Sequence, residues 1–196
     1  MTVIVTGATS FIGRAVVKAL LEEGCRVVAV SRPASAGAGK LQELFEDLKK
    51  QAGAEEKVFG SLELCFCELG EIEKLEKIYK KEELQAKAWL HLGWDGAGSD
   101  KRKDVKLQEK NIGYALQSLH TAAALGCKRF LFSGSQAEYG ICNEWMKEEQ
   151  ECHPVSEYGK DKVLVYQQAT KAAKELGVDY IPVFSACMVR GIIHGL

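Results

Sequence analysis

The feature that constrains the fold most is a short apolar run that leads through a glycine turn into an amphipathic helix. Residues 2–6 have the apolar character of a buried strand, and Gly7 and Gly13 lie in the turn and in the helix start. Over residues 11–23, apolar side chains recur at helical spacing, and Gly24 follows as a helix stop. A strand, tight turn and helix in this order form the first half of a βαβ unit, which predicts a parallel sheet.

The same alternation continues along the chain. Apolar runs of strand length alternate with longer segments of helical periodicity, and glycines stand at several helix ends. Because helical crossovers connect parallel strands, this pattern predicts an α/β domain over residues 1–186 with a Rossmann-like, doubly wound parallel sheet. The expected strands are 2–6, 26–30, 62–66, 88–92, 129–132 and 178–184, and the expected helices are 11–23, one around 41–48, one around 72–79, 103–125 and 156–176.

Composition argues against several classes of protein. The 196 residues include 26 Lys and Arg against 27 Asp and Glu, a balance unlike that of proteins that bind nucleic acid through its phosphates. No apolar stretch approaches the ~20 residues of a membrane-spanning helix, and the N-terminus lacks the charged start of a signal peptide. The seven cysteines are an odd number without a Cys-x-x-Cys pair, so we expect no disulfide framework, no metal site and a cytoplasmic location. Cys65 and Cys67 are expected to be buried thiols.

The glycine turn has the chemistry of a phosphate-binding loop. Gly7 permits the tight turn, and Gly13 permits close packing of the helix on the strand. The free N–H groups at the helix start, at Phe11 and Ile12, are expected to hold a pyrophosphate. Ser10 stands where the middle glycine of the usual fingerprint lies, and its hydroxyl can donate to phosphate. The alternative is an ordinary strand–turn–helix without a ligand.

The end of the second expected strand indicates which dinucleotide the loop would hold. Sites for NAD usually place Asp or Glu here, where the carboxylate binds the ribose diol. This chain has Ser31 and Arg32 instead, a hydroxyl and a guanidinium that suit a 2′-phosphate. We therefore expect NADP in preference to NAD, and the alternative is that Arg32 only faces water.

A tyrosine, a lysine and the serines at the end of a strand suggest acid–base chemistry. Tyr158 and Lys162 are four apart on one expected helix, so they share a face. A nearby ammonium favours the phenolate and so lowers the pKa of a phenol, which lets the tyrosine exchange a proton with a substrate oxygen. Ser133 and Ser135 follow the fifth expected strand, where a hydroxyl can orient the same oxygen, although both could simply end the strand.

Five features follow one another along the chain: TGATSFIG at the N-terminus, HLGW at the fourth strand, Asn111 in the long helix, SGSQAEYG at the fifth strand, and the pair Tyr158 and Lys162. Together they resemble the extended short-chain dehydrogenase/reductase family, in its NAD(P)-dependent epimerase/dehydratase branch. The resemblance implies hydride transfer at a carbon of a nucleotide-activated sugar. It also implies a possible homodimer formed through helices 103–125 and 156–176. The residues that could serve as contacts are Ala122, Ala123, Ala124, Val163, Tyr166 and Ala169.

The resemblance also assigns roles to individual residues. Tyr158 would be the acid/base, Lys162 its partner and a ligand of the nicotinamide ribose, and Ser135 the family's serine. The residues expected to contact the cofactor are Gly7, Ser10, Phe11, Ile12, Gly13, Ser31, Arg32, Glu68, Leu69, Leu92, Gly93, Trp94, Asn111, Ser133, Tyr158 and Lys162.

Several of these residues also have a purely structural interpretation. Asn111 could instead brace the long helix against the backbone. His91 is expected in the core. Trp94 and Trp145 could line a sugar pocket or merely pack, and Glu138 could touch substrate or face solvent.

The chain departs from the family pattern after Ala186. The family continues Tyr-Gly-Pro-Gly-Asp, and a back-translation of residues 187–196 read in a shifted frame yields that continuation. We therefore expect residues 187–196 to be a frame-altered or truncated tail, and most of the C-terminal substrate domain to be missing. This leaves an alternative function open, a catalytically impaired fragment that binds a dinucleotide.

Overall fold

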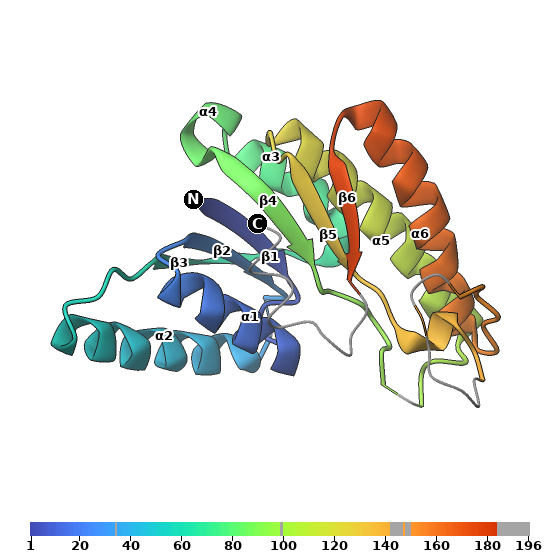
Figure 1. The fold of residues 1–196 in the computed structure, drawn as a ribbon, viewed down its shortest axis with the longest axis horizontal. Helices are drawn as coiled ribbons and strands as arrows, with labels where there is room; N and C mark the ends of the chain where they lie inside the picture. The colour runs from blue at the N-terminus through green and yellow to red at the C-terminus, as the bar shows by residue number, and fades with distance from the viewer. Residues whose placement is uncertain (34, 99, 142–146, 148–149, 184–196) are drawn as a thin grey trace.

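Six parallel strands form a single sheet in the order β3-β2-β1-β4-β5-β6 (Figure 1). The computed structural model describes residues 1–183 apart from 34, 99, 142–146 and 148–149, so the tail 187–196 and Trp145 lie outside the described residues. The order confirms the doubly wound topology expected from sequence. The strands are β1 (Thr2–Thr6), β2 (Arg26–Ser31), β3 (Ser61–Phe66), β4 (Ala86–His91), β5 (Arg129–Ser133) and β6 (Asp179–Val183).

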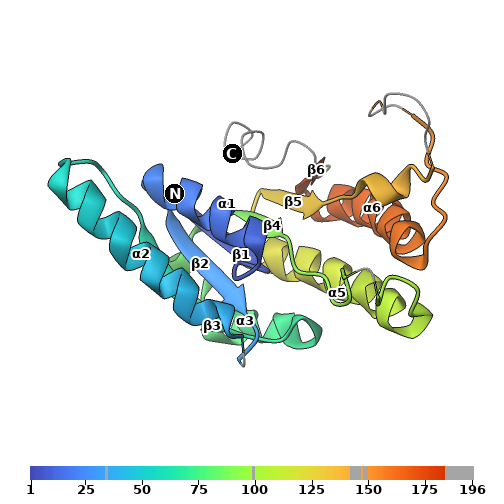
Figure 2. The same cartoon turned by 90° about the horizontal axis from the view of Figure 1, so that it is seen from below.

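Helices cover both faces of the sheet (Figure 2). One core lies between the sheet and the pair α1 and α2, and the other lies between the sheet and the pair α5 and α6. The central strands are buried on both faces, which explains why they are continuously apolar in sequence. The helices are α1 (Phe11–Glu22), α2 (Gly37–Ala54), η1 (Leu69–Lys74), α3 (Leu75–Ile78), α4 (Lys81–Leu84), α5 (Val105–Ala124), η2 (Gln136–Glu138) and α6 (Glu157–Leu176).

Side-chain caps fix the start of the helices that border the functional cleft. The Ser10 hydroxyl accepts a hydrogen bond from the Gly13 amide at 2.9 Å, and the Ser156 hydroxyl accepts from the Gly159 amide at 3.1 Å. Asp104 caps α5 in the same way. These caps satisfy amides that have no partner within the helix, so α1, α5 and α6 begin at defined positions.

Strands β1 and β4 form the central pair of the sheet. They run in register from Val3 beside Ala88 to Thr6 beside His91, and the register shifts between Thr2 and Val3 at the opposite end. The Thr6 hydroxyl lies 3.1 Å from Nδ1 of His91, which stacks on Phe130 and Phe132. His91 is therefore a core residue, as the sequence predicts.

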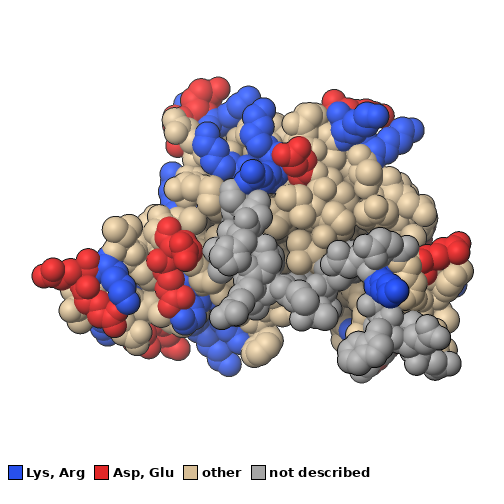
Figure 3. Space-filling model, viewed as in Figure 1, with Lys and Arg blue, Asp and Glu red and all other residues tan. Residues whose placement is uncertain are grey.

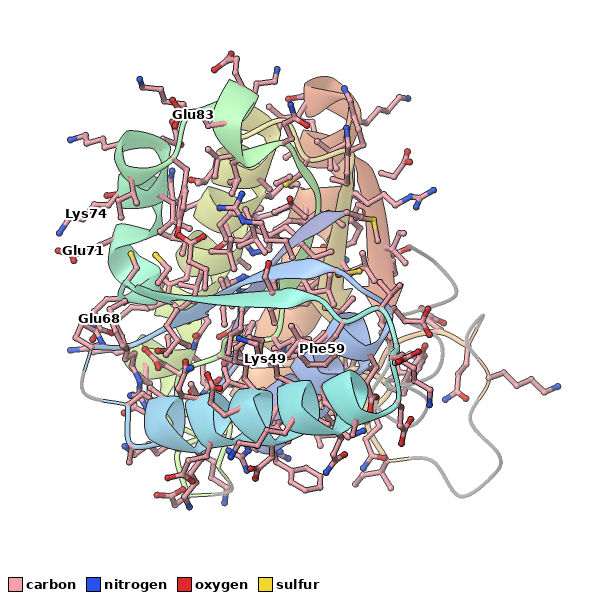
Figure 4. All side chains as sticks on the ribbon, turned by 90° about the vertical axis from the view of Figure 1, so that its left-hand side faces the viewer. Lys49, Phe59, Glu68, Glu71, Lys74 and Glu83 are labelled. Atoms are coloured by element: carbon pink, nitrogen blue, oxygen red, sulfur yellow. The ribbon has the colours of Figure 1, made fainter. Side chains whose placement is uncertain are left out.

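The segment around 72–79 differs from the single helix expected there. The backbone at Glu71 leaves helical geometry, with φ −132°, so 3₁₀ turns and two short helices replace a continuous helix. Its charged side chains point outward in Figure 4, where Lys74 pairs with Glu71 at 2.7 Å. Buried Ile72, Leu75 and Leu84 anchor the segment.

The residues predicted to form dimer contacts on α5 and α6 differ in their exposure. Ala122 and Ala169 are buried inside the chain, which contradicts their expected role as contacts between two copies, whereas Tyr166 is 44% exposed. The dimer stays a prediction. On the face that Figure 3 shows, charged side chains of both signs lie around the edges. Within the described part of the chain, no helix has the length and apolar character needed to cross a bilayer.

Candidate functional site

A cleft of about 870 Å³ lies at the carboxyl ends of the central strands. The strand order reverses where β1 meets β4, and open α/β sheets bind ligands at such a switch point. Gly13, Glu68 and Asn111 do not line the cleft, and Glu68 is exposed beyond the end of β3 (Figure 4). The other residues expected from sequence all line it: Gly7, Ser10, Phe11, Ile12, Ser31, Arg32, Leu69, Leu92, Gly93, Trp94, Ser133, Ser135, Tyr158 and Lys162.

The loop between β1 and α1 is shaped by two glycines. Gly7 has φ +70°, and a Cβ there would lie 2.7 Å from the Gly93 nitrogen. A Cβ on Gly13 would lie 2.2 Å from the Gly7 oxygen, so α1 packs directly against the turn. The first amides of α1 lie at the positive end of the helix dipole, where a phosphate is stabilised. Because Ser10 accepts from Gly13, its hydroxyl hydrogen stays available for a ligand oxygen.

A group of polar residues lies at the end of β2. Arg32 is exposed and lines the cleft together with Ser31, Ser35 and Thr9, whose hydroxyl lies 3.0 Å from that of Ser35. Among the described lining residues Asp95 is the only carboxylate, and it follows β4 rather than β2. This part of the cleft therefore offers a cation and hydroxyls to an anionic group.

Lys162 reaches the cleft from α6 and is 2% exposed. Its Nζ donates to the Ser133 carbonyl oxygen at 2.6 Å. The same nitrogen lies 3.9 Å from the ring centroid of Trp94 and 4.3 Å from that of Phe132. Burial lowers the pKa of Lys162 to about 7, and the negative charge of Glu138 acts in the opposite direction.

Tyr158 lies one turn before Lys162 and is 7% exposed. Burial raises the pKa of its phenol, while a hydrogen bond from Ser135 and the charge of Arg102 lower it. The sequence led us to expect a lowered pKa through Lys162. Instead burial outweighs the lowering effects, and the positive charge that lowers the pKa is that of Arg102, although Lys162 Nζ also lies 5.7 Å from the ring centroid.

Arg102 is a site residue that the sequence analysis missed. Its guanidinium carbon lies 4.7 Å from the Tyr158 ring centroid, and its carbonyl oxygen accepts from the Tyr158 amide at 3.2 Å. The Arg102 Nε donates to the Ala97 oxygen at 2.8 Å, which holds the side chain in the wall of the cleft. No sequence pattern distinguishes Arg102 from the other charged residues before α5. Arg102 becomes part of the site only because the folded chain brings it against Tyr158 at the start of α6.

Asn111 holds the loop that carries Asp95. The Asn111 Oδ1 accepts from the Asp95 amide at 2.7 Å, and its Nδ2 donates to the Asp95 oxygen at 3.0 Å. Trp94 lines the cleft, and its Nε1 donates to the Gln108 Oε1 at 2.8 Å, so it packs against α5, while contact with a sugar stays a prediction. These contacts favour the bracing role for Asn111 over direct contact with a ligand.

Comparison with known proteins gives consistent matches. A model of the NAD dependent epimerase/dehydratase family matches residues 3–186. UDP-glucose 4-epimerase GEPI48 from Cyamopsis tetragonoloba is 27% identical over 166 residues, which are 84% of this chain and 45% of that protein. The dTDP-6-deoxy-L-talose 4-dehydrogenase (NAD(+)) of Aggregatibacter actinomycetemcomitans is 30% identical over 168 residues, 85% of this chain and 53% of that protein.

The fold is also that of a solved structure. UDP-glucose 4-epimerase from Brucella ovis in complex with NAD matches with a TM-score of 0.74 and 18% identity, over 93% of this chain and 51% of that one. The chain spans about half the length of the curated relatives that it matches.

Proposed function

Since the chain belongs to the NAD dependent epimerase/dehydratase family, we propose that it binds a nicotinamide dinucleotide in this cleft and catalyses hydride transfer at a carbon of a nucleotide-activated sugar. The observation that carries the proposal is the arrangement of the cleft. A phosphate loop at β1 and the group Ser135, Tyr158 and Lys162 line one continuous space. The printed names of the relatives support a nucleotide sugar as the substrate class.

The residues present fit a dinucleotide. Gly7 and Gly13 let the turn, α1 and the segment after β4 approach one another closely, because a Cβ at either position would clash with backbone atoms. The α1 amides suit the pyrophosphate. Leu92 and Gly93, in the segment after β4, line the cleft next to the glycine loop. When bound, the nicotinamide supplies the hydride acceptor and donor for the sugar.

The chain's own residues would move the proton. Tyr158 would take a proton from a sugar hydroxyl and return it to the carbonyl, and Ser135 would orient that oxygen. The Lys162 ammonium and the Arg102 guanidinium would stabilise the phenolate, because each places a cation near the ring. Trp94 packs its ring against Tyr158 at 5.6 Å between centroids and so limits where the phenol can lie.

For the cofactor itself, we propose NADP in preference to NAD. The family description and the NAD in the Brucella structure favour NAD, whereas the side chains after β2 favour a 2′-phosphate. Arg32 could bind that phosphate through both arms of its guanidinium, with Ser31 and Ser35 beside it.

Fluorescence titrations with NADPH and NADH test the cofactor proposal. We expect tighter binding of NADPH, and at least about a tenfold loss of NADPH affinity in Arg32→Ala, since charge-assisted hydrogen bonds contribute about 1.5–3 kcal/mol. Lys128→Ala is the control, because it removes an equal charge from an exposed residue beside the amino end of β5. Tighter binding of NADH by the unchanged chain would refute the NADP preference.

Turnover separates the enzyme from a dinucleotide-binding fragment. UDP-glucose and the bound dinucleotide are incubated with the chain and with Tyr158→Phe, and products are separated by chromatography. Loss of product in Tyr158→Phe supports the acid/base role, whereas equal product in both refutes it. Binding of dinucleotide without product, by a chain half the length of its relatives, supports the alternative of a catalytically impaired fragment.

A further inference from the structure

Glu138 is a buried acid beside the proposed catalytic group. It lies in η2 and is 3% exposed, so it does not face solvent. Its Oε1 accepts a hydrogen bond from the Ser135 amide at 2.6 Å, and the Ser135 hydroxyl accepts from the Ala137 amide at 3.2 Å. This reciprocal pair fixes the backbone from which the Ser135 hydroxyl projects.

A hydrogen bond to Ser135 does not by itself require a charged side chain, since a glutamine could accept it. The negative charge of Glu138 also acts on the Lys162 ammonium. Among the described residues, no carboxylate lies within ion-pair distance of Lys162, whose ammonium is held by a carbonyl oxygen and aromatic rings. A buried ammonium without a counter-charge is costly. Glu138 accepts from the Ser135 amide and Lys162 donates to the Ser133 carbonyl oxygen, so the two buried side chains bind the same short segment after β5, and the Glu138 charge favours the protonated lysine.

Other groups also face the Glu138 carboxylate. Tyr158 and Lys162 come from α6, Tyr180 from β6, and Cys152 from the segment that precedes α6. Burial raises the pKa of Glu138, and the Ser135 amide and the Lys162 ammonium oppose that rise. Its charge also raises the pKa of the Tyr158 phenol, so Lys162 is the group whose ionised form it favours.

We propose that Glu138 is a positioning residue with two roles, one for its hydrogen bond and one for its charge. Through the backbone amide it fixes Ser135, and across the buried space it keeps Lys162 protonated. The proposal rests on the proposed function, because that function assigns Ser135 to orient the substrate oxygen and Lys162 to stabilise the phenolate. It predicts that an uncharged isostere keeps the loop in place and still changes the ionisation of Lys162.

The test follows the ionisation of Lys162 itself. The chain is labelled with ¹³C lysine, the Cε signal of Lys162 is identified by its loss in Lys162→Met, and the signal is followed against pH. We expect a midpoint near 7 in the unchanged chain and a midpoint lower by about one pH unit in Glu138→Gln. Glu175→Gln removes an equal charge from an exposed position on α6 and should leave the midpoint unchanged.

Circular dichroism and urea unfolding show whether Glu138→Gln is folded. An unchanged Lys162 midpoint in a folded Glu138→Gln chain would overturn the proposal. If that variant does not fold, Glu138→Asp keeps the charge on a shorter side chain, and we expect its midpoint to stay near that of the unchanged chain. A midpoint lowered by a full unit in Glu138→Asp would also overturn it. The titration needs neither dinucleotide nor sugar, so failure of the proposed function would be seen separately, as absent dinucleotide binding.

Discussion

Replacing Gly13 by alanine tests whether close packing of α1 on the turn shapes the phosphate loop. The new Cβ would lie 2.2 Å from the Gly7 oxygen and 2.7 Å from the Ala8 carbonyl carbon. Both neighbours are backbone atoms of the loop, so they cannot rotate away as a side chain would. Overpacking of this kind costs about 1–3 kcal/mol, offset by the roughly 0.5–1 kcal/mol that alanine gains over glycine within a helix.

Gly113 provides the matched control. It lies in α5, and a Cβ there would meet nothing within 4 Å. Gly113→Ala has the same gain in helix propensity without the clash, so it should be more stable than the unchanged chain by roughly 0.5–1 kcal/mol. The difference between the two alanine variants isolates the clash and should be about 1–3 kcal/mol.

Urea unfolding gives the two stabilities, and NADPH fluorescence gives the affinity of the loop. We expect Gly13→Ala to lose at least about tenfold in affinity, because amides displaced from the phosphates lose charge-assisted hydrogen bonds. Gly113→Ala should bind as the unchanged chain does. If Gly13→Ala equals Gly113→Ala in both stability and affinity, the close approach of α1 to the turn does not shape the loop.

Two further predictions follow from cleft and core charges. Arg102→Gln removes the cation over the Tyr158 ring and should raise the pKa of that phenol, because the guanidinium charge favours the phenolate. Absorbance titration at the phenolate band checks this, with Tyr158→Phe to identify the signal, and an identical pKa would contradict it. Burial lowers the pKa of His91 to about 3, so its stabilising contribution is present above its unfolded pKa of about 6.5 and declines as pH falls from there towards 3. Urea unfolding should show a loss of about 2 kcal/mol between pH 7.5 and pH 5 that shrinks in His91→Asn, and an equal loss in both chains would refute this origin.

The strands and the glycine turn after β1 could be predicted because their signals are local. Buried parallel strands are apolar along their whole length, and a turn between strand and helix needs glycine at fixed offsets. The spacing of Tyr158 and Lys162 likewise lies within one helix, and the structure places both on the cleft. The family resemblance then supplied roles that spacing alone could not.

The parts that sequence could not predict depend on contacts between distant segments. Arg102 becomes a neighbour of Tyr158 because the loop after β4 meets the start of α6, a contact that no local pattern encodes. Glu138 looks like an exposed acid in a polar turn until its carboxylate is seen to bind the Ser135 amide. The kink at Glu71 likewise breaks a segment whose apolar spacing alone indicates one helix.

The paired strands β1 and β4 connect the two parts of the cleft, the glycine loop and the group around Tyr158 and Lys162. The glycine loop follows β1, whereas the Tyr158 phenol and the Lys162 ammonium lie against Trp94 after β4 and Phe132 of β5. A shift of one residue in the pairing of β1 and β4 would move the glycine loop by about 3.3 Å relative to Tyr158 and Lys162. This distance is as large as the separation at which two reacting atoms must be held. The register of this pair shifts between Thr2 and Val3, at the end of the strands opposite the cleft. At the end that borders the cleft, Thr6 pairs with His91, and the Thr6 hydroxyl lies 3.1 Å from His91 Nδ1. The irregular pairing of β1 and β4 therefore lies at the opposite end of the sheet from the residues that the proposed hydride and proton transfers would need in fixed positions.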